Sequence, residues 1–429
     1  MVKLLRQTYR FFIHSDRGNI ILIIGVALAI LLSWCCFLDN LYKISDDTLT
    51  YFYAGKVLAN GEIDYLRTPI YPLICITFEY LFDSVVLEAL SILNIIVFLV
   101  SIIYLYRTIS LFTQRRTIKF ITTVLYAWNI PGMVMCLNIT PDSPSISFVI
   151  IFGYLITRMI TGTSSRNTIW YVSIILIFLI LLRPYNICLI PVLLIAVYIS
   201  HLKGKLKFRA TILSLGLSGA LLCGYCLWFM NTYGFFGLSY VSSNNIFCIM
   251  NPSFTEQMHY TAECVFPKVG KDKAILWFWL DRDYCKSQLE EIIYNNPKVL
   301  IDSKLSYLLT SSYHRFPFSA TIISRLYADP FQNVDLGTIY SLLSALFLVE
   351  IYFWRKNKAT KYAVPIMLHL LTCAICIITA IAGSANFDAH RLVMPIFPSL
   401  CLLAGLFTAQ LNIRIPRDAS VQQSRFFIE

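Results

Sequence analysis

Charged residues are scarce in this chain of 429 residues: Asp, Glu, Lys and Arg make up 14%, against roughly 25% in soluble domains. Hydrophobic residues make up 57%, and the mean hydropathy is +0.67. A soluble globular protein is therefore excluded, because too few polar groups remain to cover its surface. Apolar runs long enough to cross a hydrocarbon core of about 30 Å recur along the chain.

Nucleotide and metal motifs are also missing. Neither GxGxxG nor GxxxxGK[ST] occurs, which excludes the common nucleotide-binding loops, so energy for a reaction must arrive in the substrate. The six His form no HxxxH or HExxH, and the 13 Cys show no zinc spacing. Cys373 and Cys376 form a CxxC inside an apolar run, where packing explains them. Cys248, Cys264 and Cys285 share one loop, and a disulfide there would leave one thiol over.

What the chain has in abundance is long apolar segments, and they predict an all-α, polytopic integral membrane protein of about ten transmembrane helices. The predicted spans are 19–38, 85–106, 118–136, 143–160, 168–182, 184–200, 210–232, 336–353, 362–382 and 392–411. Arg183-Pro184 separates the fifth span from the sixth, because proline breaks a helix. The first span is longer than the apolar region of a signal peptide, so we expect a retained anchor.

The net charge of +11 lies mostly in short clusters between spans. Most Lys and Arg fall in segments that share a side with the N-terminus, which the positive-inside rule places in the cytoplasm. We therefore expect both termini in the cytoplasm and a protein of the cytoplasmic (inner) membrane. No basic face remains for a groove, which argues against nucleic acid as a partner.

This orientation leaves two large loops outside, facing the periplasm or exterior. Residues 1–233 form a transmembrane core that includes the first outer loop, 39–84. Residues 234–335 form a helical outer loop or cap, which we expect to pack on the membrane surface because it is rich in apolar and aromatic residues. Residues 336–429 supply the last transmembrane helices and a short cytoplasmic tail.

Three acids stand out at the outer membrane boundary. Asp46 and Asp47 follow the first span, and Tyr51 and Ala54 continue at helical spacing, which predicts a short interfacial helix beginning near Asp47. Asp142 lies in the turn before the fourth span. Each acid has two readings: a cap on free helix N–H groups, or a carboxylate that acts in catalysis, for Asp47 as general base.

Several cations are expected on the same face. Arg67 begins the sequence Arg-Thr-Pro-Ile-Tyr-Pro-Leu, whose two prolines predict an extended, turning path. Its guanidinium suits bidentate contact with phosphate, although an Arg that only reaches toward lipid head groups is the alternative. Arg183 and the pair His390-Arg391 lie at other outer boundaries, and His314-Arg315 in the long loop can join them. Together they predict an anion-binding pocket.

These motifs resemble the GT-C superfamily of membrane glycosyltransferases, and within it the bacterial branch akin to protein mannosyltransferases and the lipid A aminoarabinose transferase. The resemblance rests on the acid after the first span, the Tyr and Ala that follow it, and the Arg-Thr-Pro-x-Tyr-Pro-Leu motif. Asn296-Pro297-Lys-Val-Leu and Gly383-Ser…His390-Arg391-Leu-Val-Met-Pro395 add to it. By motif it covers about fifty residues.

The resemblance implies an enzyme that moves a sugar from a polyprenyl phosphate-linked donor to a glycan, lipid or protein acceptor outside the membrane. The catalytic acid falls on Asp47, with Asp46 as its rival, and the second loop acid on Asp142. The donor phosphate is assigned to Arg67, Arg183, His390 and Arg391. The donor or acceptor pocket is assigned to Tyr51, Tyr71, His314 and Arg315. No cofactor is firmly implied, and a divalent cation stays open.

Two other functions remain as alternatives. An O-antigen or polysaccharide polymerase or ligase also uses lipid-linked donors at the outer face, and product length distinguishes it. A lipid-linked sugar transporter or flippase should carry ionisable or broken segments near the bilayer midplane, whereas here the ionisable residues gather at the boundaries.

Overall fold

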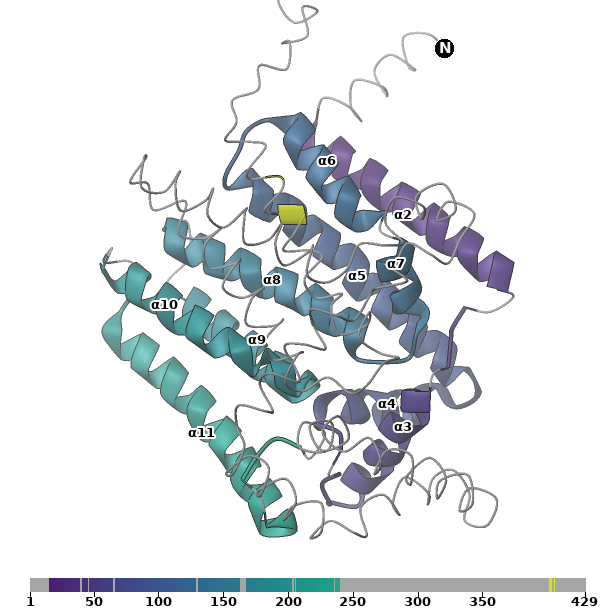
Figure 1. The fold of residues 1–429 in the computed structure, drawn as a ribbon, viewed down its shortest axis with the longest axis vertical. Coiled ribbons are helices and arrows are strands. Elements are labelled where there is room, and N and C mark those ends of the chain that lie inside the picture. Colours follow the sequence, from purple (N-terminus) through teal and green to yellow (C-terminus); the bar gives the residue numbers. More distant parts are fainter. Residues whose placement is uncertain are drawn as a thin grey trace, which may run out of the picture.

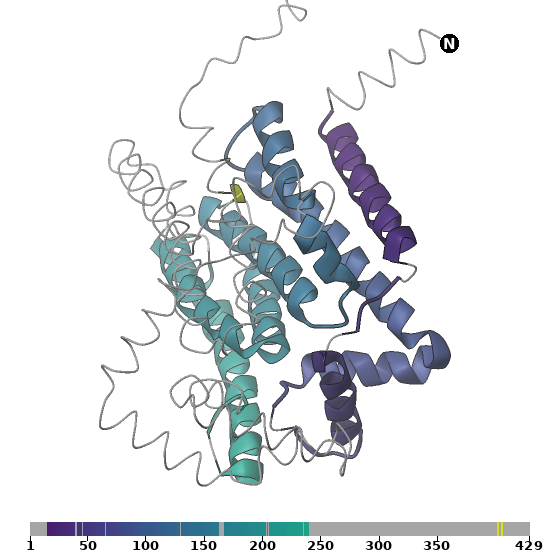
Figure 2. The ribbon, with the colours of Figure 1, turned by 45° about the vertical axis from the view of Figure 1, so that its right-hand side comes forward.

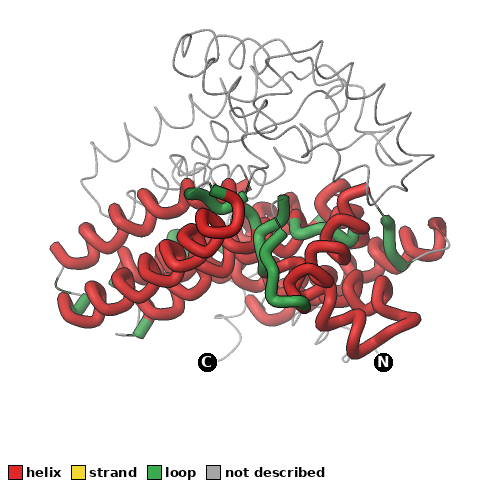
Figure 3. The backbone as a smooth tube through the Cα atoms, turned by 90° about the horizontal axis from the view of Figure 1, so that it is seen from below, coloured by secondary structure: helices red, strands yellow, loops and turns green. Residues whose placement is uncertain are grey.

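The computed structural model describes residues 15–38, 41–44, 46–64, 66–128, 130–162, 167–202, 204, 206–234, 236–239, 401, 402 and 405. Most of loop 234–335 and of the three C-terminal spans therefore lies outside the described residues. Helices account for nearly all of the described chain, and short loops join them (Figure 3). The predicted all-α class is confirmed for this part of the chain.

The apolar runs form long helices. They are α2 (Asp16–Leu38), α5 (Val86–Ser110), α8 (Asp142–Thr161), α9 (Thr168–Leu182), α10 (Leu189–Leu202) and α11 (Phe208–Tyr233). Five segments are long and apolar enough to cross a membrane: Asp16–Cys36, Ile70–Ser110, Asp142–Thr161, Pro184–Leu202 and Phe208–Tyr233. Exposed leucines at four-residue spacing on α11, such as Leu213 and Leu217, suit a lipid-facing surface. The chain is thus a multi-pass membrane protein.

The bundle is organised around α5, which packs most extensively against α8. α2, α6, α8, α9 and α10 contribute to the same apolar core (Figure 1). The first, second, fourth, fifth, sixth and seventh predicted spans all coincide with helix. The break at Arg183-Pro184 is present: Arg183 is extended, with φ −147° and ψ 120°, and the short 3-10 helix η2 (Pro184–Cys188) leads into α10.

The prediction of one helix over 118–136 is wrong. The chain forms α6 (Arg116–Ala127) and then α7 (Ile130–Leu137), with a break after Trp128. Pro131 explains the break, because proline lacks an N–H and is tolerated in the first turn of a helix but not in its interior.

The first loop contains two helices, α3 (Asp46–Ala59) and α4 (Ile70–Phe82). α3 begins where helical spacing predicted. The extended path expected from the prolines is wrong, because Pro69 immediately precedes α4 and Pro72 lies in its first turn, where proline is tolerated. α4 then turns through η1 (Asp83–Val85) into α5, and Figure 2 shows α4 running across the direction of α5.

α3 and α4 pack closely against each other at one end of the bundle (Figure 1). Gly55 makes this approach possible, because a Cβ there would lie 2.7 Å from the carbonyl oxygen of Pro72. Tyr51 of α3 and Tyr71 of α4 meet edge to face, with ring centroids 5.0 Å apart.

The segments that precede α3 and α8 lie side by side. The Lys43 N–H donates to the Leu137 carbonyl at 2.8 Å, and the Ile139 N–H donates to the Lys43 carbonyl at 3.2 Å, which makes an isolated parallel bridge. Thr48 in the first turn of α3 donates to the Ile139 carbonyl at 3.1 Å. These hydrogen bonds bring the start of α3 close to the start of α8.

A buried charge marks the opposite end of the bundle. Lys119 of α6 is 2% exposed, and its Nζ lies 2.8 Å from Oδ2 of Asp16, at the start of α2. Tyr106 of α5 donates to Oδ1 of Asp16 at 2.8 Å and accepts from Asn19 at 3.3 Å. Arg116 Nε lies 4.0 Å from the same carboxylate. We call Asp16, Asn19, Tyr106, Arg116 and Lys119 the Asp16 cluster.

Candidate functional site

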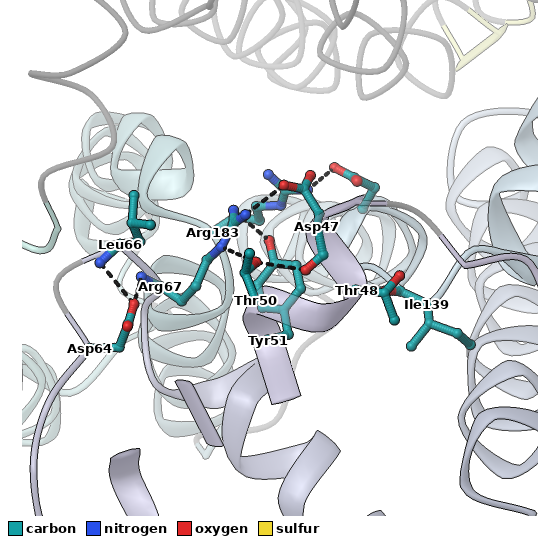
Figure 4. A network of polar contacts seen from close by, with 10 residues as sticks. Asp47, Thr48, Thr50, Tyr51, Asp64, Leu66, Arg67, Ile139 and Arg183 are labelled. Carbon is teal, nitrogen blue, oxygen red and sulfur yellow. Dashed lines mark hydrogen bonds and ion pairs between the residues drawn. The ribbon is translucent and has the colours of Figure 1, made fainter. Parts of the chain in front are cut away.

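Charged side chains from four separate segments meet at the α3–α4 end of the bundle. Asp47 comes from the first turn of α3, Arg67 from the loop before α4, Asp142 from the first residue of α8, and Arg183 from the residue after α9. Tyr51 lies among them. We call these five residues the Asp47 cluster; Figure 4 labels Asp47, Tyr51, Arg67 and Arg183.

Arg67 binds α3 through all three of its guanidinium nitrogens. Its Nη2 lies 2.5 Å from Oδ1 of Asp47, its Nε donates to Thr50 Oγ1 at 2.9 Å, and its Nη1 donates to the Tyr51 hydroxyl at 3.3 Å. The guanidinium carbon also lies 4.5 Å from the centroid of the Tyr51 ring, a cation–π contact. The planar, five-donor group of arginine suits this many-sided contact.

Burial alone would lower the pKa of Arg67, but the Tyr51 hydroxyl and the Asp47 carboxylate outweigh it and raise the pKa. The guanidinium therefore keeps its charge despite being mostly buried, with 13% of the side chain exposed. A permanent, fixed positive charge at this end of the bundle is what an anionic ligand would require.

The backbone of Arg67 is held by Asp64. Oδ1 of Asp64 accepts the Leu66 N–H at 2.8 Å and the Arg67 N–H at 2.7 Å. Asp64 is 5% exposed, and burial raises its pKa although these two N–H groups act in the opposite direction.

Arg183 and Asp142 form a second ion pair, between Nη2 and Oδ1. It is more deeply buried than the first, with 11% of the Arg183 side chain and 3% of the Asp142 side chain exposed. Burial alone would lower the pKa of Arg183, but the Asp142 carboxylate, and after it Tyr51, raise it. Pro141 occupies the N-cap position of α8, so Asp142 is its first helical residue.

Tyr51 lies within electrostatic range of all four charges. Burial is the main cause that raises the pKa of its hydroxyl; Arg183 and Arg67 lower it, and Asp47 and Asp142 raise it further. Two guanidiniums and two carboxylates give this group of charges a formal sum of zero. The Asp47 cluster is therefore balanced before any ligand enters.

The segment that follows Arg183 makes further hydrogen bonds between buried polar groups. Asn186 Nδ2 donates to Ser145 Oγ at 3.0 Å and to the Leu179 carbonyl at 2.8 Å. Ser145 Oγ also lies 3.2 Å from the Tyr185 hydroxyl. This chain of contacts joins the first turn of α8 to η2 and fixes the segment that carries Arg183.

The structure thus brings together five of the predicted site residues, Asp47, Tyr51, Arg67, Asp142 and Arg183, with Tyr71 packed against Tyr51. Asp46 is the first residue of α3, and its side chain is outside the description, so the choice between Asp46 and Asp47 as base stays open. His314, Arg315, His390 and Arg391 lie outside the described residues, as do Cys248, Cys264 and Cys285.

Three residues that contribute to this site were missed from the sequence: Thr50, Asp64 and Asn186. Thr50 lies one helical turn after Asp47, a spacing that could have indicated it. Asn186 is a polar residue in an apolar run, which is a usable signal in a membrane protein. Asp64 has no such signal, because it is one of several acids in the loop 39–84.

Metal ligands do not gather among the residues that the structure describes: it places no group of three or more His, Cys, Asp or Glu side chains suited to an ion there. Of the charged residues in the Asp47 cluster, both acids are paired with arginines. The Asp47 cluster itself offers two carboxylates, two guanidiniums and the Tyr51 hydroxyl.

Residues 67–228 match the family model of dolichyl-phosphate-mannose-protein mannosyltransferases. The match covers well under half of the chain, and it begins at Arg67. It includes Arg67, Tyr71, Asp142 and Arg183, whereas Asp46, Asp47 and Tyr51 precede it. No curated protein is significantly similar to the chain. Over this part the chain is similar to a family of membrane glycosyltransferases, and its apolar helices agree with a multi-pass membrane protein.

Proposed function

We propose that this protein transfers a sugar from a polyprenyl phosphate-linked donor to an acceptor hydroxyl at the outer face of the cytoplasmic membrane. The single observation that carries the proposal is the Asp47 cluster, in which two carboxylates and two guanidiniums from distant segments meet at one end of the bundle. The family match supports lipid-linked sugar transfer in general. The outer location follows from the distribution of Lys and Arg along the sequence.

In the proposed reaction, an oxygen of the acceptor hydroxyl attacks the anomeric carbon of the donor sugar. The bond from that carbon to the phosphate oxygen breaks as the new bond forms, so the configuration inverts. Asp47 takes the hydroxyl proton, and the polyprenyl phosphate leaves with the bonding electrons. Arg67 and Arg183 stabilise the negative charge that develops on it, which is the kind of electrostatic contribution that dominates such transfers.

The ion pair between Asp47 and Arg67 implies that the donor binds before Asp47 acts as the base. Asp47 Oδ1 is held 2.5 Å from Arg67 Nη2, and a guanidinium in contact with a carboxylate opposes its protonation. A donor phosphate that draws Arg67 toward itself would weaken this contact and leave Asp47 a better proton acceptor. Donor binding would then make Asp47 more basic. Without a bound donor, Asp47 would stay paired with Arg67 and would be a weaker base toward water.

Charge balance supports the same exchange. The formal charge of the cluster is already zero. A phosphate that binds there must therefore compete with a carboxylate for one of the two arginines, or be neutralised by further cations of the protein. His390 and Arg391, which the sequence places at the same face, are the candidates for that further charge. The proposed phosphate site therefore comprises Arg67, Arg183, His390 and Arg391.

The test is transfer by the purified full-length protein with a polyprenyl phosphate-linked sugar, with mass spectrometry of the product. Transfer of single sugars is expected, and Asp47→Asn should abolish it while the protein stays folded. Asp46→Asn is the matched control, because it removes the adjacent acid. If Asp47→Asn is fully active and Asp46→Asn is not, Asp46 is the base. A ladder of repeat units would replace the proposal with a polymerase.

A further inference from the structure

Asp64 is a buried acid that the proposed reaction does not use. It is 5% exposed and lies in the loop between α3 and α4, whereas most of the other acids whose side chains the structure describes are solvent-accessible or paired with cations. Burying a carboxylate costs free energy unless its oxygens accept hydrogen bonds. Its contacts are with the backbone: Oδ1 accepts the N–H groups of Leu66 and Arg67 at 2.8 and 2.7 Å.

This arrangement fixes the main chain at Arg67. A side-chain oxygen that accepts N–H groups two and three residues ahead closes a tight turn. The side chain of Arg67 leaves this turn toward α3, where it reaches Asp47, Thr50 and Tyr51. Arg67 is thus held at both ends: Asp64 accepts its backbone N–H, and residues of α3 bind its guanidinium.

The residue before this turn is also attached to α11. Ile63, the residue before Asp64, is 1% exposed and packs against Tyr225 and Phe229 of α11. The Tyr233 hydroxyl donates to the Ile63 carbonyl. Asp64 therefore stands between a segment anchored on α11 and the arginine that faces Asp47.

We propose that Asp64 is a positioning residue, which holds Arg67 where it meets the donor phosphate by accepting the two backbone N–H groups. This inference rests on the proposed function, since Arg67 is assigned there to the phosphate. Asp64 touches neither donor nor acceptor, so its loss should act through Arg67 alone and weaken donor binding more than it slows the chemical step.

The experiment measures kcat and the donor KM of the full-length enzyme for Asp64→Ala, Asp64→Asn and Glu62→Ala. Asp64→Ala is expected to raise the donor KM by about 10- to 100-fold, with a smaller change in kcat, because a cation displaced by about 1 Å loses much of its effect. Asp64→Asn should restore the wild-type KM, because its amide oxygen can accept the same two N–H groups. Glu62→Ala is the matched control, an exposed acid in the same loop.

A double variant separates positioning from general damage to the fold. In an Arg67→Ala background, adding Asp64→Ala should raise the donor KM no further, because Asp64 acts through Arg67. A further tenfold rise there would overturn the proposal. So would a wild-type KM in Asp64→Ala, or an Asp64→Asn variant as impaired as Asp64→Ala. If Asp64→Ala does not fold, Asp64→Ser replaces it, since a hydroxyl can accept one N–H.

The two proposals fail in different ways. A wild-type protein that transfers no sugar from any polyprenyl phosphate-linked donor removes the proposed function. An active wild-type protein whose donor KM is indifferent to Asp64→Ala leaves the function in place and removes only the positioning role.

Discussion

Both ends of the bundle contain ion pairs, but the pairs differ in number and in burial. In the Asp16 cluster one acid receives Lys119, Tyr106 and, at 4.0 Å, Arg116, and the acid itself is 48% exposed at its side chain. In the Asp47 cluster two acids and two arginines meet, and their side chains are 3–22% exposed. One end has a single partly solvated acid, and the other has two acids mostly withdrawn from water.

This difference indicates different roles. The Asp16 cluster joins the start of α2, the last turns of α5 and the start of α6, so its contacts tie helix ends that the apolar core already holds together. The side chains of the Asp47 cluster come from loops and helix starts. Its four charged groups are more than would be needed to hold these segments together. Ionisable groups whose pKa values are shifted by burial together with a specific charge partner are common at functional sites.

The largest expected effect comes from leaving a buried cation unpaired. Asp142→Ala should lower the free energy of unfolding by about 3–5 kcal/mol, because Arg183 would keep its charge without its partner. Lys119→Met at the other end leaves Asp16, which is half exposed and can be solvated, and should cost about 1 kcal/mol or less. Denaturant unfolding in detergent measures both variants. Equal losses would show that the two clusters do not differ in this respect.

Sugar transfer should separate the clusters next. Arg67→Ala is expected to reduce the rate of transfer by about 10²- to 10³-fold, because it removes a cation from the developing phosphate charge. Lys119→Met should retain the wild-type rate per folded molecule. A radiolabelled donor assay gives both rates, and a Lys119→Met variant as inactive as Arg67→Ala would remove the functional distinction between the two ends.

A smaller effect tests the proposed exchange of Arg67 between Asp47 and phosphate. Asp47→Asn should bind polyprenyl phosphate about tenfold more tightly than the wild type, because the phosphate no longer has to displace the Asp47 carboxylate from Arg67. A hydrogen bond to a charged group is worth about 1.5 kcal/mol. Direct binding of polyprenyl phosphate without sugar measures this, independently of transfer. Unchanged or weaker binding would mean that Asp47 and the phosphate do not compete for Arg67.

The smallest effect concerns pH. Burial raises the pKa of Asp64 above its ordinary value of 3.8, so the folded protein holds this proton more tightly than the unfolded chain. Its contribution to stability is complete below pH 3.8 and is lost as the pH rises through the folded pKa. Asp64→Asn should therefore gain stability relative to the wild type as the pH rises. Unfolding at several pH values, with Glu62→Gln as control, checks this; a constant difference contradicts it.

Much of the fold follows from the sequence, because span length and apolar run length are linked by the thickness of the bilayer. The start of α3 also follows, since Tyr51 and Ala54 sit at helical spacing from Asp47 and are both buried. A proline is involved in both wrong predictions: Pro72 was expected in an extended segment, and Pro131 lies inside the predicted span 118–136. Pro72 and Pro131 both lie in the first turn of a helix, and the sequence does not distinguish a helix start from an interior without its neighbours in space.

The candidate site follows from the sequence only in part. The residue types and their common face favoured Asp47, Arg67, Asp142 and Arg183, and the structure places these four together. The pairing of each acid with its arginine depends on the tertiary structure, because it is set by how α8 and α9 pack against the first loop. Asp64 was missed for the same reason, because an acid in a polar loop shows its burial only once α11 is in place.

The backbone bridge between Lys43 and Asn138 has a consequence for how this site tolerates change. Each of these residues is followed four positions later by an acid of the cluster, Asp47 on one strand of the bridge and Asp142 on the other. The spacing between the two acids is thus set partly by main-chain hydrogen bonds, which do not depend on the side chains at 43 and 138. Sequence drift at 43 and 138 should leave the site unchanged, and only proline at 43 or 139, which removes a donor, should uncouple the two acids.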